Sequence, residues 1–232
     1  MPLTLAKLPR LPAFASIDAA TRDALMREVR LRDIAPGQCC FAQGEAGEEV
    51  VLLVEGCLKL MRTSRAGRTA IVRVAYAGEL FGIGPAMGMP RYLLTAIAIR
   101  RSRVALWRTA DWHRVLGTTP ESTDVLRVLG ERLDDAYDRL VNNATLDVTA
   151  RLIHEILQLA DQVGRLTEDG TLVDLPLTRE DLAAMTGTTL HNVSRILSRL
   201  EKQGFVRGGR RRLLVLDVEG LVRLANEQNS AA

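Results

Sequence analysis

The chain has 232 residues, of which 47% are hydrophobic and 25% are charged, a balance typical of globular domains with real cores. Its formal net charge is only +3, so the overall charge gives little support for a nucleic-acid partner. The chain has no apolar run near the roughly 20 residues of a membrane helix, no signal-peptide layout, and no disulfide or zinc spacing among its three cysteines. We therefore expect a cytoplasmic protein with no membrane contact and no bound metal.

The first half of the chain changes from a short helix to a series of short strands. Residues 16–29 have an amphipathic pattern that Ser16 can cap, which predicts a helix. The β-favouring runs that follow are separated by turn signals, and they are Val50–Val54, Cys57–Met61, Ala70–Ala75, Leu94–Ile99 and Val104–Trp107. Many short strands at nearly regular spacing indicate a β sandwich or roll rather than a βαβ sheet.

A long helix is expected over residues 121–143. Apolar side chains recur along it at spacings of three, four, three and four, the a/d pattern of a helix paired along its length. The residues of this seam are Leu126, Leu129, Leu133, Ala136 and Leu140. Charged residues flank the seam, which favours an exposed helix in a symmetric dimer. Packing of the helix onto the chain's own β domain is the alternative.

Residues 178–205 have the pattern of a helix-turn-helix. Thr178 begins a variant of the capping box, with an acid three residues later, and Gly187 breaks the first helix. Apolar residues between Val193 and Leu200 recur at helical spacing, which leaves the opposite face of the second helix polar and basic. Because such a helix enters the major groove, we expect its exposed side chains to read bases: His191, Ser194 and Arg195.

Contacts with the DNA backbone are expected around this helix. The residues with suitable hydroxyl, amide or guanidinium donors are Thr178, Arg179, Thr189, Asn192, Arg199, Arg207, Arg210 and Arg211. Residues 204–216 predict two strands joined by a tight turn at Gly208-Gly209, which would form a basic wing. Between Arg195 and Arg212 seven basic residues stand against one acid, so the local charge favours a polyanion. A small helical packing unit with solvated arginines is the alternative.

Patterns in both halves of the chain together resemble one family. The stretches that carry the resemblance are Gly44-Glu45, Val50–Val54, Glu55–Leu60, Gly78–Gly82 and the helix-turn-helix from Leu177 to Val206. They resemble the superfamily of the cyclic-AMP receptor protein and the fumarate-nitrate reduction regulator (Crp/Fnr), and the similarity extends from about Phe14 to Leu224. These are transcription regulators that bind double-stranded DNA.

The resemblance implies an α+β architecture in three parts. Residues 1–117 would form an effector-sensing β roll of the cyclic-nucleotide-binding type, residues 118–144 a coiled dimerisation helix, and residues 145–232 a winged helix-turn-helix. The resemblance also implies a homodimer on a palindromic operator with half-sites about one helical turn apart. The family commonly has a glutamate where His191 stands, so we expect the guanine read by Arg195 to persist while the neighbouring base pair differs.

The resemblance also places an effector pocket in the roll, at Phe81, Gly82, Ile83, Met87, Arg91 and Tyr92. In cyclic-nucleotide binders the glycine that matches Gly82 is followed by a glutamate that holds the ribose, and here the position is Ile83. The phosphate-binding Arg-Ser pair falls at Tyr92-Leu93, with Arg91 one place earlier. Isoleucine cannot accept a hydrogen bond from a hydroxyl, which argues against cyclic AMP and favours another effector.

Two other cofactors occur among such sensors. The oxygen-sensing branch ligates an iron–sulfur cluster with four cysteines, whereas this chain has only Cys39, Cys40 and Cys57, which are expected to be small buried hydrophobes. A redox role for them stays open. A haem is the second option, with these candidate axial ligands: Cys57, Met87, Met89, His113 and His154.

These patterns predict an effector-gated, sequence-specific transcription regulator, and a ligand-free constitutive regulator is the alternative. An effector module that acts through other proteins is a further alternative, against which Arg195 and the basic wing argue. The chain has no phosphate loop, nucleophile elbow or metal-ligand cluster, so we do not expect an enzyme. RNA polymerase is an expected partner, through residues 164–174 or the roll surface. The sequence leaves open whether the protein activates or represses.

Overall fold

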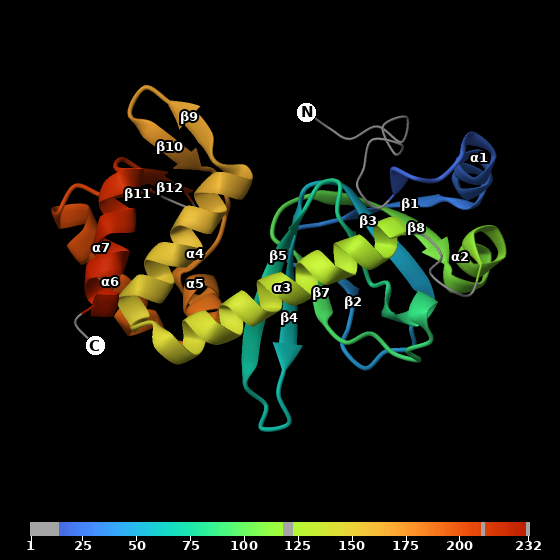
Figure 1. The fold of residues 1–232 in the computed structure, drawn as a ribbon, viewed down its shortest axis with the longest axis horizontal. Coiled ribbons are helices and arrows are strands. Elements are labelled where there is room, and N and C mark those ends of the chain that lie inside the picture. Colours follow the sequence, from blue (N-terminus) through green and yellow to red (C-terminus); the bar gives the residue numbers. More distant parts are fainter. Residues whose placement is uncertain (1–13, 118–122, 210–211, 231–232) are drawn as a thin grey trace. The chain divides into compact units, whose positions relative to one another are not determined.

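The computed structural model describes residues 14–117, 123–209 and 212–230, which form two compact units (Figure 1). The first unit ends at Asp134 and the second begins at Asp135, so the division lies within the long helix α3 (Thr123–Thr145). In the described ranges, no helix is both long and apolar enough to span a membrane.

The first unit contains a β roll of two antiparallel four-stranded sheets. One has the strand order β1-β8-β3-β6 and the other the order β2-β7-β4-β5. The strands are β1 (Arg30–Ile34), β2 (Cys39–Phe41), β3 (Glu49–Glu55), β4 (Cys57–Thr63), β5 (Thr69–Tyr76), β6 (Leu80–Phe81), β7 (Thr95–Ala98) and β8 (Ser102–Arg108). The prediction of a β roll is therefore confirmed.

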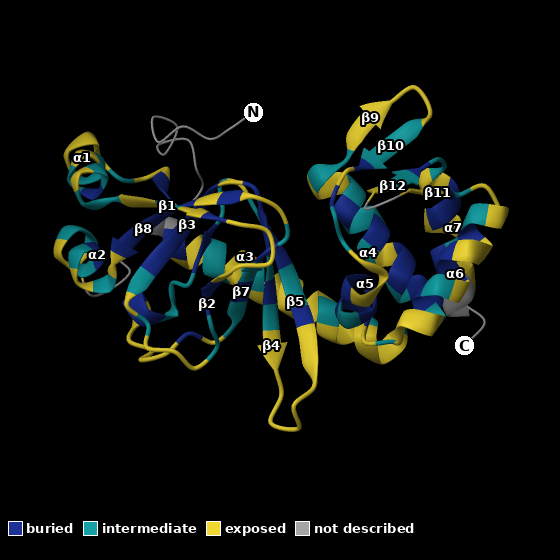
Figure 2. Cartoon of the chain, turned by 180° about the vertical axis from the view of Figure 1, so that it is seen from behind, coloured by how far each residue is buried: buried dark blue, intermediate teal, exposed yellow. Residues whose placement is uncertain are grey.

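The strand β3 is apolar without alternation because both of its faces are buried (Figure 2). Val51 and Leu53 belong to the core between the sheets, while Val50 and Leu52 belong to a second core that includes residues of the helices α1 (Ala19–Glu28) and α2 (Thr109–Leu116). In this second core the indole of Trp107 donates a hydrogen bond to the carbonyl of Leu25 over 2.9 Å.

The helix α1 begins later than expected. Its N-cap is Asp18, whose carboxylate accepts from the backbone N–H of Thr21 over 2.7 Å. Ser16 was expected in that role and precedes the helix, so that prediction is wrong. An aspartate makes an equally good cap, so both residues were candidates from the sequence.

The second unit is a winged helix-turn-helix. Its helices are α4 (Val148–Val163), α5 (Arg179–Thr186), α6 (Leu190–Lys202) and α7 (Val218–Ser230). Its strands are β9 (Arg165–Thr167), β10 (Gly170–Val173), β11 (Val206–Gly209) and β12 (Arg212–Val215), in the sheet order β11-β12-β10-β9. α4 packs against α7 and α5, and α5 against α6.

The predicted turn at Gly208-Gly209 is wrong, because both glycines are strand residues that pair with Leu213 and Arg212. The backbone N–H of Gly208 donates to Oε1 of Glu201 on α6 over 2.9 Å, and a Cβ at Gly208 would lie 2.3 Å from that oxygen. A side chain at this position would therefore displace the carboxylate of Glu201 from its present hydrogen bond with the wing.

Candidate DNA interface and effector cavity

The two helices of the helix-turn-helix are set by their caps. Thr178 accepts from the backbone N–H of Asp181 over 3.0 Å, and the carboxylate of Asp181 accepts from the backbone N–H of Thr178 over 2.9 Å, which completes the predicted capping box. α5 ends at Gly187 with a φ of 64°, a left-handed conformation that suits glycine. Thr189 then caps α6 by accepting from the N–H of Asn192.

The face of α6 that packs into the second unit is fully apolar. Its buried residues are Val193, Ile196, Leu197 and Leu200. His191 and Arg195 are exposed on the opposite face, and Ser194 between them is partly buried. The structure therefore brings the three predicted base-reading residues together in the first two turns of α6.

The guanidinium of Arg195 is loosely oriented by a chain of polar side chains. Its Nη2 lies 3.4 Å from Oδ1 of Asn192, whose Nδ2 donates in turn to Oγ1 of Thr188 over 3.1 Å. The bond to Arg195 is long and exposed, so it costs little to exchange for a base edge. Asn192, a predicted contact of the DNA backbone, is thus also placed to orient Arg195.

The other predicted backbone-contacting residues have varied surroundings. Arg199 donates from Nη2 to Oγ1 of Thr149 at the start of α4 over 3.3 Å. Arg207 forms an exposed ion pair with Asp169, between β9 and β10, at 3.4 Å. Two of the predicted residues, Arg210 and Arg211, lie outside the described residues.

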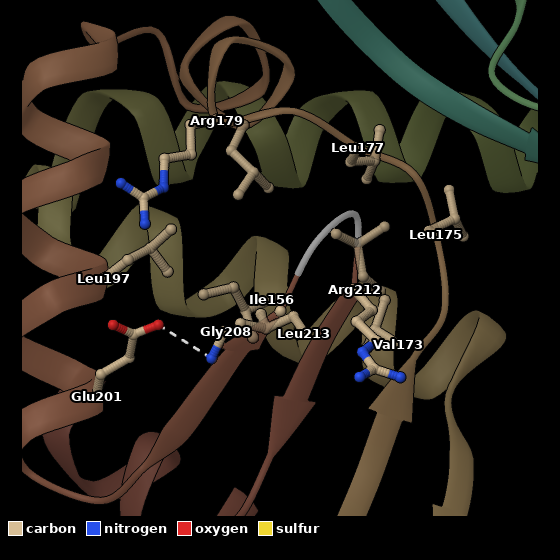
Figure 3. A pocket seen from close by; sticks show the side chains of 13 residues that line it. Ile156, Val173, Leu175, Leu177, Arg179, Leu197, Glu201, Gly208, Arg212 and Leu213 are labelled. Carbon is tan, nitrogen blue, oxygen red and sulfur yellow. Dashed lines mark hydrogen bonds between the residues drawn. The ribbon is translucent and has the colours of Figure 1, made fainter.

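A cavity of about 310 Å³ lies between α4, α5, α6 and the wing (Figure 3). Its walls are mainly leucines and other apolar residues, and the bonded pair of Glu201 and Gly208 lies on its wing side. Arg179 is exposed, and its side chain extends toward Leu197 at the cavity's edge. A phosphate contact by Arg179 would therefore take place beside this cavity.

One polar contact of the second unit was not predicted from the sequence. Arg151 of α4 donates from Nε to the carbonyl of Thr186, the last residue of α5, over 3.1 Å. Its Nη1 donates to the carbonyls of Leu146 over 2.9 Å and Asn143 over 3.3 Å. One side chain thus joins the end of α3, the α3–α4 connection and the start of the turn in the helix-turn-helix. The partners are carbonyls, which carry no residue-type signal in a sequence.

The first unit has its own cavity, of about 230 Å³, between the roll and α3. Four of the residues predicted for an effector pocket line it: Phe81, Gly82, Ile83 and Tyr92. The ring of Tyr92 stacks on Phe41 with centroids 4.1 Å apart, and its hydroxyl donates to the carbonyl of Glu49 over 2.8 Å. A Cβ on Gly82 would lie 3.1 Å from Phe41 and 3.3 Å from Tyr92, so glycine leaves the wall undistorted.

Two predicted pocket residues do not line this cavity. The Nη1 of Arg91 donates to the carbonyl of Gly44 over 2.6 Å, and 38% of the Met87 surface is exposed. In their place, two arginines that the sequence reasoning missed take part in the lining: Arg73 of β5 and Arg132 of α3. Both form ion pairs with Glu79.

Two family models match the chain. Residues 31–119 match the cyclic nucleotide-binding domain and residues 150–224 match the Crp-like helix-turn-helix domain. A CRP-like cAMP-activated global transcriptional regulator of Mycobacterium tuberculosis is 27% identical over 225 residues, which cover 94% of this chain and 98% of that protein. The chain belongs to the Crp/Fnr superfamily.

Two other comparisons are consistent with membership of this superfamily. The global nitrogen regulator of Synechococcus elongatus is 25% identical over 82% of this chain and 86% of its own length. The structure of FixK2 from Bradyrhizobium japonicum has the same fold, with a TM-score of 0.74 and 22% identity over 84% of this chain and 96% of that chain. Members of the Crp/Fnr superfamily are transcription regulators and not enzymes, and this Crp/Fnr protein is a transcription regulator with a DNA-binding helix-turn-helix.

Cyclic AMP does not fit the lining of the Crp/Fnr roll in this chain. The residue after Gly82 is Ile83, which has no acceptor for a ribose hydroxyl. The arginine nearest the expected phosphate-binding position, Arg91, is bonded to Gly44 and is not part of the cavity lining. The cavity therefore lies where the nucleotide pocket of the family is expected, but it lacks the side chains expected to bind the ribose and the phosphate.

The cysteines of this Crp/Fnr protein are poorly suited to redox or metal chemistry. Burial raises the pKa of Cys40 to about 11 and that of Cys57 to about 12. Cys39 is classed as exposed, but partial burial of its thiol raises the pKa there too. A thiol with a raised pKa is a weak nucleophile and a weak ligand at neutral pH. Within the described ranges, no group of three or more His, Cys, Asp or Glu side chains is placed to hold a metal ion.

The candidate haem ligands are also dispersed. The Nε2 of His113 lies 2.8 Å from the carbonyl oxygen of Ala86, which can only accept, so that nitrogen carries its proton and cannot bind iron. His154 lies on α4 in the second unit, and Met89 is 44% exposed. The residues of the roll cavity itself include no histidine, cysteine or methionine among those described.

The seam of α3 in this Crp/Fnr chain is largely exposed. Leu126, Leu133 and Leu140 expose 49%, 54% and 66% of their surfaces, and Ala136 is exposed too. Leu129 differs from the others, because it is partly buried and lines the roll cavity. Neighbouring Tyr137 and Val141 extend the exposed apolar face.

Proposed function

We propose that this protein is a homodimeric, effector-gated transcription regulator that binds a two-fold symmetric operator through α6. The observation that carries the proposal is the division of α6 into a buried apolar face and an exposed face with His191 and Arg195 in its first two turns. A helix of this kind presents its N-terminal side chains to base edges in the major groove.

We assign specificity to Arg195 and His191, with Ser194 beside them. Arg195 would donate two bonds to O6 and N7 of a guanine, a contact that sets one base pair of each half-site. His191 would contact the neighbouring pair, where a histidine prefers a purine N7 or a guanine O6. Phosphate contacts are assigned to the donors that surround α6, namely Thr178, Arg179, Thr189, Asn192, Arg199, Arg207, Arg210 and Arg211.

The dimer is proposed on the apolar face of α3. Exposed leucines at helical spacing on one helix are costly in water and are removed from it by a second copy of the same helix. A two-fold dimer would place two copies of α6 about one helical turn of DNA apart, some 34–36 Å. This spacing predicts a palindromic operator.

The effector is proposed to occupy the roll cavity, next to Leu129 and Arg132 of α3. Some relatives are named as cAMP-activated, whereas the lining of this cavity supports a different ligand. Occupation would shift α3 and thereby the population of the DNA-binding state. We further infer action in the cytoplasm with RNA polymerase as a partner, through residues 164–174 or the roll surface.

The test is a selection of duplexes from a random library by the purified protein, followed by titration of the enriched sequence at several salt concentrations. The proposal expects a palindrome whose half-sites contain a guanine, and an affinity that falls steeply with salt. Binding that is equal for all sequences would contradict it, as would binding that stays absent when candidate effectors are added. A Leu133→Glu variant tests the dimer, because a charge on the seam should yield a monomer by light scattering and weaken operator binding. An exposed control on the same helix, Asp138→Lys, should remain dimeric.

A further inference from the structure

We propose that the roll cavity binds a small monoanion with an apolar body, such as a medium-chain carboxylate, and that Arg73 and Arg132 recognise its charged end. This inference names the chemical class of the effector in the proposed function. It concerns binding to the roll and does not require DNA.

The body of the cavity is apolar. Its walls include Phe41, Leu60, Val72, Leu94 and Leu129. Its volume of about 230 Å³ lies below the roughly 300–1,000 Å³ of typical ligand pockets, which suits a small ligand. Water in such a cavity would find few polar partners, so an apolar ligand replaces it favourably.

The polar part of the lining is cationic. Arg73 on β5 and Arg132 on α3 share one carboxylate, that of Glu79, which pairs with Arg73 and lies 3.5 Å from Nη2 of Arg132. Two guanidinium groups and one carboxylate thus meet at this end of the cavity, an arrangement that favours an anionic ligand. A cation would be repelled by the two guanidinium groups, and a dianion would be under-compensated.

One donor of this cluster has no acceptor. The side chain of Arg73 is only 19% exposed, and its Nη1 is bonded to Glu79. Its Nη2 is buried and makes no hydrogen bond in the described part of the chain. Because this nitrogen has almost no accessible area, a ligand oxygen reaches it only after the side chain of Arg73 turns toward the cavity, and the hydrogen bond formed there would recover the cost of the unpartnered donor. A carboxylate oxygen accepts such a bond better than a neutral hydroxyl does.

The same cluster connects the cavity to α3. Besides its contact with Glu79, the Nη2 of Arg132 donates to the carbonyl of Leu80 over 2.6 Å. An anion that enters the cavity competes with Glu79 for Arg132, and it does so one turn from Leu129, whose side chain lines the same cavity. The charged end of the ligand would thus be sensed by the helix that carries the proposed dimer seam.

The experiment uses hexanoate, octanoate and decanoate, with hexanol, octanol and decanol as neutral counterparts of the same chain length. Binding to the purified full-length protein is measured by calorimetry at pH 7.5, below the concentrations at which micelles form. We expect at least one carboxylate to bind more than tenfold more tightly than its alcohol. Equal affinity of the acid and alcohol pairs, or no binding by any acid, would overturn the proposal.

Variants of Arg73 and Arg65 test whether the preference for carboxylates over alcohols arises in the roll cavity. Arg73→Met removes the guanidinium and keeps an unbranched apolar side chain, and it should reduce the ratio of acid to alcohol affinity at least tenfold. Arg65→Met removes the same charge from an exposed position on the β4–β5 turn and should leave the ratio unchanged. If Arg73→Met does not fold, Arg132→Met is measured instead with the same expectation. An unchanged ratio in the folded variant would show that the anion binds elsewhere, which rejects the proposed site.

Operator binding by the protein without any ligand is measured separately. A protein that binds its operator but prefers no carboxylate contradicts the ligand assignment alone. A protein that binds carboxylates but binds no operator, either alone or with the carboxylate bound, contradicts the proposed function alone.

Discussion

The guanidinium of Arg151 donates to the carbonyl of Thr186 over 3.1 Å and so ties α4 to the last residue of α5. The same side chain also bonds the carbonyls of Asn143 and Leu146. A helix end leaves its last carbonyls without partners, and here one cation satisfies two such groups, at the ends of α3 and α5, together with a carbonyl of the α3–α4 connection. The link holds the turn of the helix-turn-helix to the start of the second unit.

Replacement of Arg151 by Met should therefore destabilise the second unit. Hydrogen bonds to a charged group contribute about 1.5–3 kcal/mol, so we expect a loss of about 2 kcal/mol in the free energy of unfolding. Urea unfolding separates the units, because both tryptophans, Trp107 and Trp112, lie in the first unit. The circular dichroism transition of the helices should move to lower urea while the tryptophan fluorescence transition stays in place. The exposed Arg165→Met is the control and should move neither.

Whether a feature of the fold or the site could be predicted from the sequence depended on how far apart its interacting residues lie in the chain. The capping box at Thr178 and the helix end at Gly187 are local, so residue types at fixed spacing were sufficient to predict them. The β roll was predictable because turn signals and strand runs repeat along the chain. The cap at Asp18 was missed by two residues, since several residue types cap helices equally well.

The long-range clusters could not be predicted in this way. Arg73 and Glu79 are only six residues apart, but Arg132 on α3 joins them only after α3 has packed on the roll. Nothing in the residues around each arginine distinguishes it from a solvated surface charge. Gly208 is predicted to lie in a turn, whereas it is a strand residue whose backbone N–H donates to the carboxylate of Glu201.

Replacement of Arg195 by Ala should lower operator affinity by about 10- to 100-fold, because a bidentate contact to guanine contributes about 1–3 kcal/mol. Fluorescence anisotropy on the selected operator and on a duplex with the guanine replaced measures the effect. The variant should bind both duplexes equally. Arg223→Ala removes the same charge from an exposed site on α7 and should retain the preference. A variant without Arg195 that still discriminates between the duplexes would assign the guanine to another residue.

Replacement of Asp169 by Asn should raise affinity for DNA. Asp169 pairs with Arg207 at 3.4 Å, and both side chains are about two-thirds exposed, so the pair is weak and its loss costs little stability. Released from the carboxylate, Arg207 is available for a phosphate, and we expect a gain of about threefold, on the order of the 0.2–1 kcal/mol of exposed ion pairs. Glu168→Gln, an exposed neighbour, removes an equal charge and should give a smaller gain. Equal gains would attribute the effect to overall charge instead of to Arg207.

The buried thiols should make the first unit less stable in alkali. The pKa of Cys40 is about 11 and that of Cys57 about 12 in the folded chain, both above the ordinary value of 9.0. Above pH 9 the unfolded chain therefore loses thiol protons that the folded chain retains, so the stability present below pH 9 falls as the pH rises toward 11–12. Urea unfolding followed by tryptophan fluorescence between pH 8 and 10.5 measures this slope. Cys57→Ala should flatten the slope even though its cavity lowers stability at pH 8, whereas Cys39→Ala, at an exposed position, should change the slope less. An unchanged slope in Cys57→Ala would assign the alkaline loss to other groups.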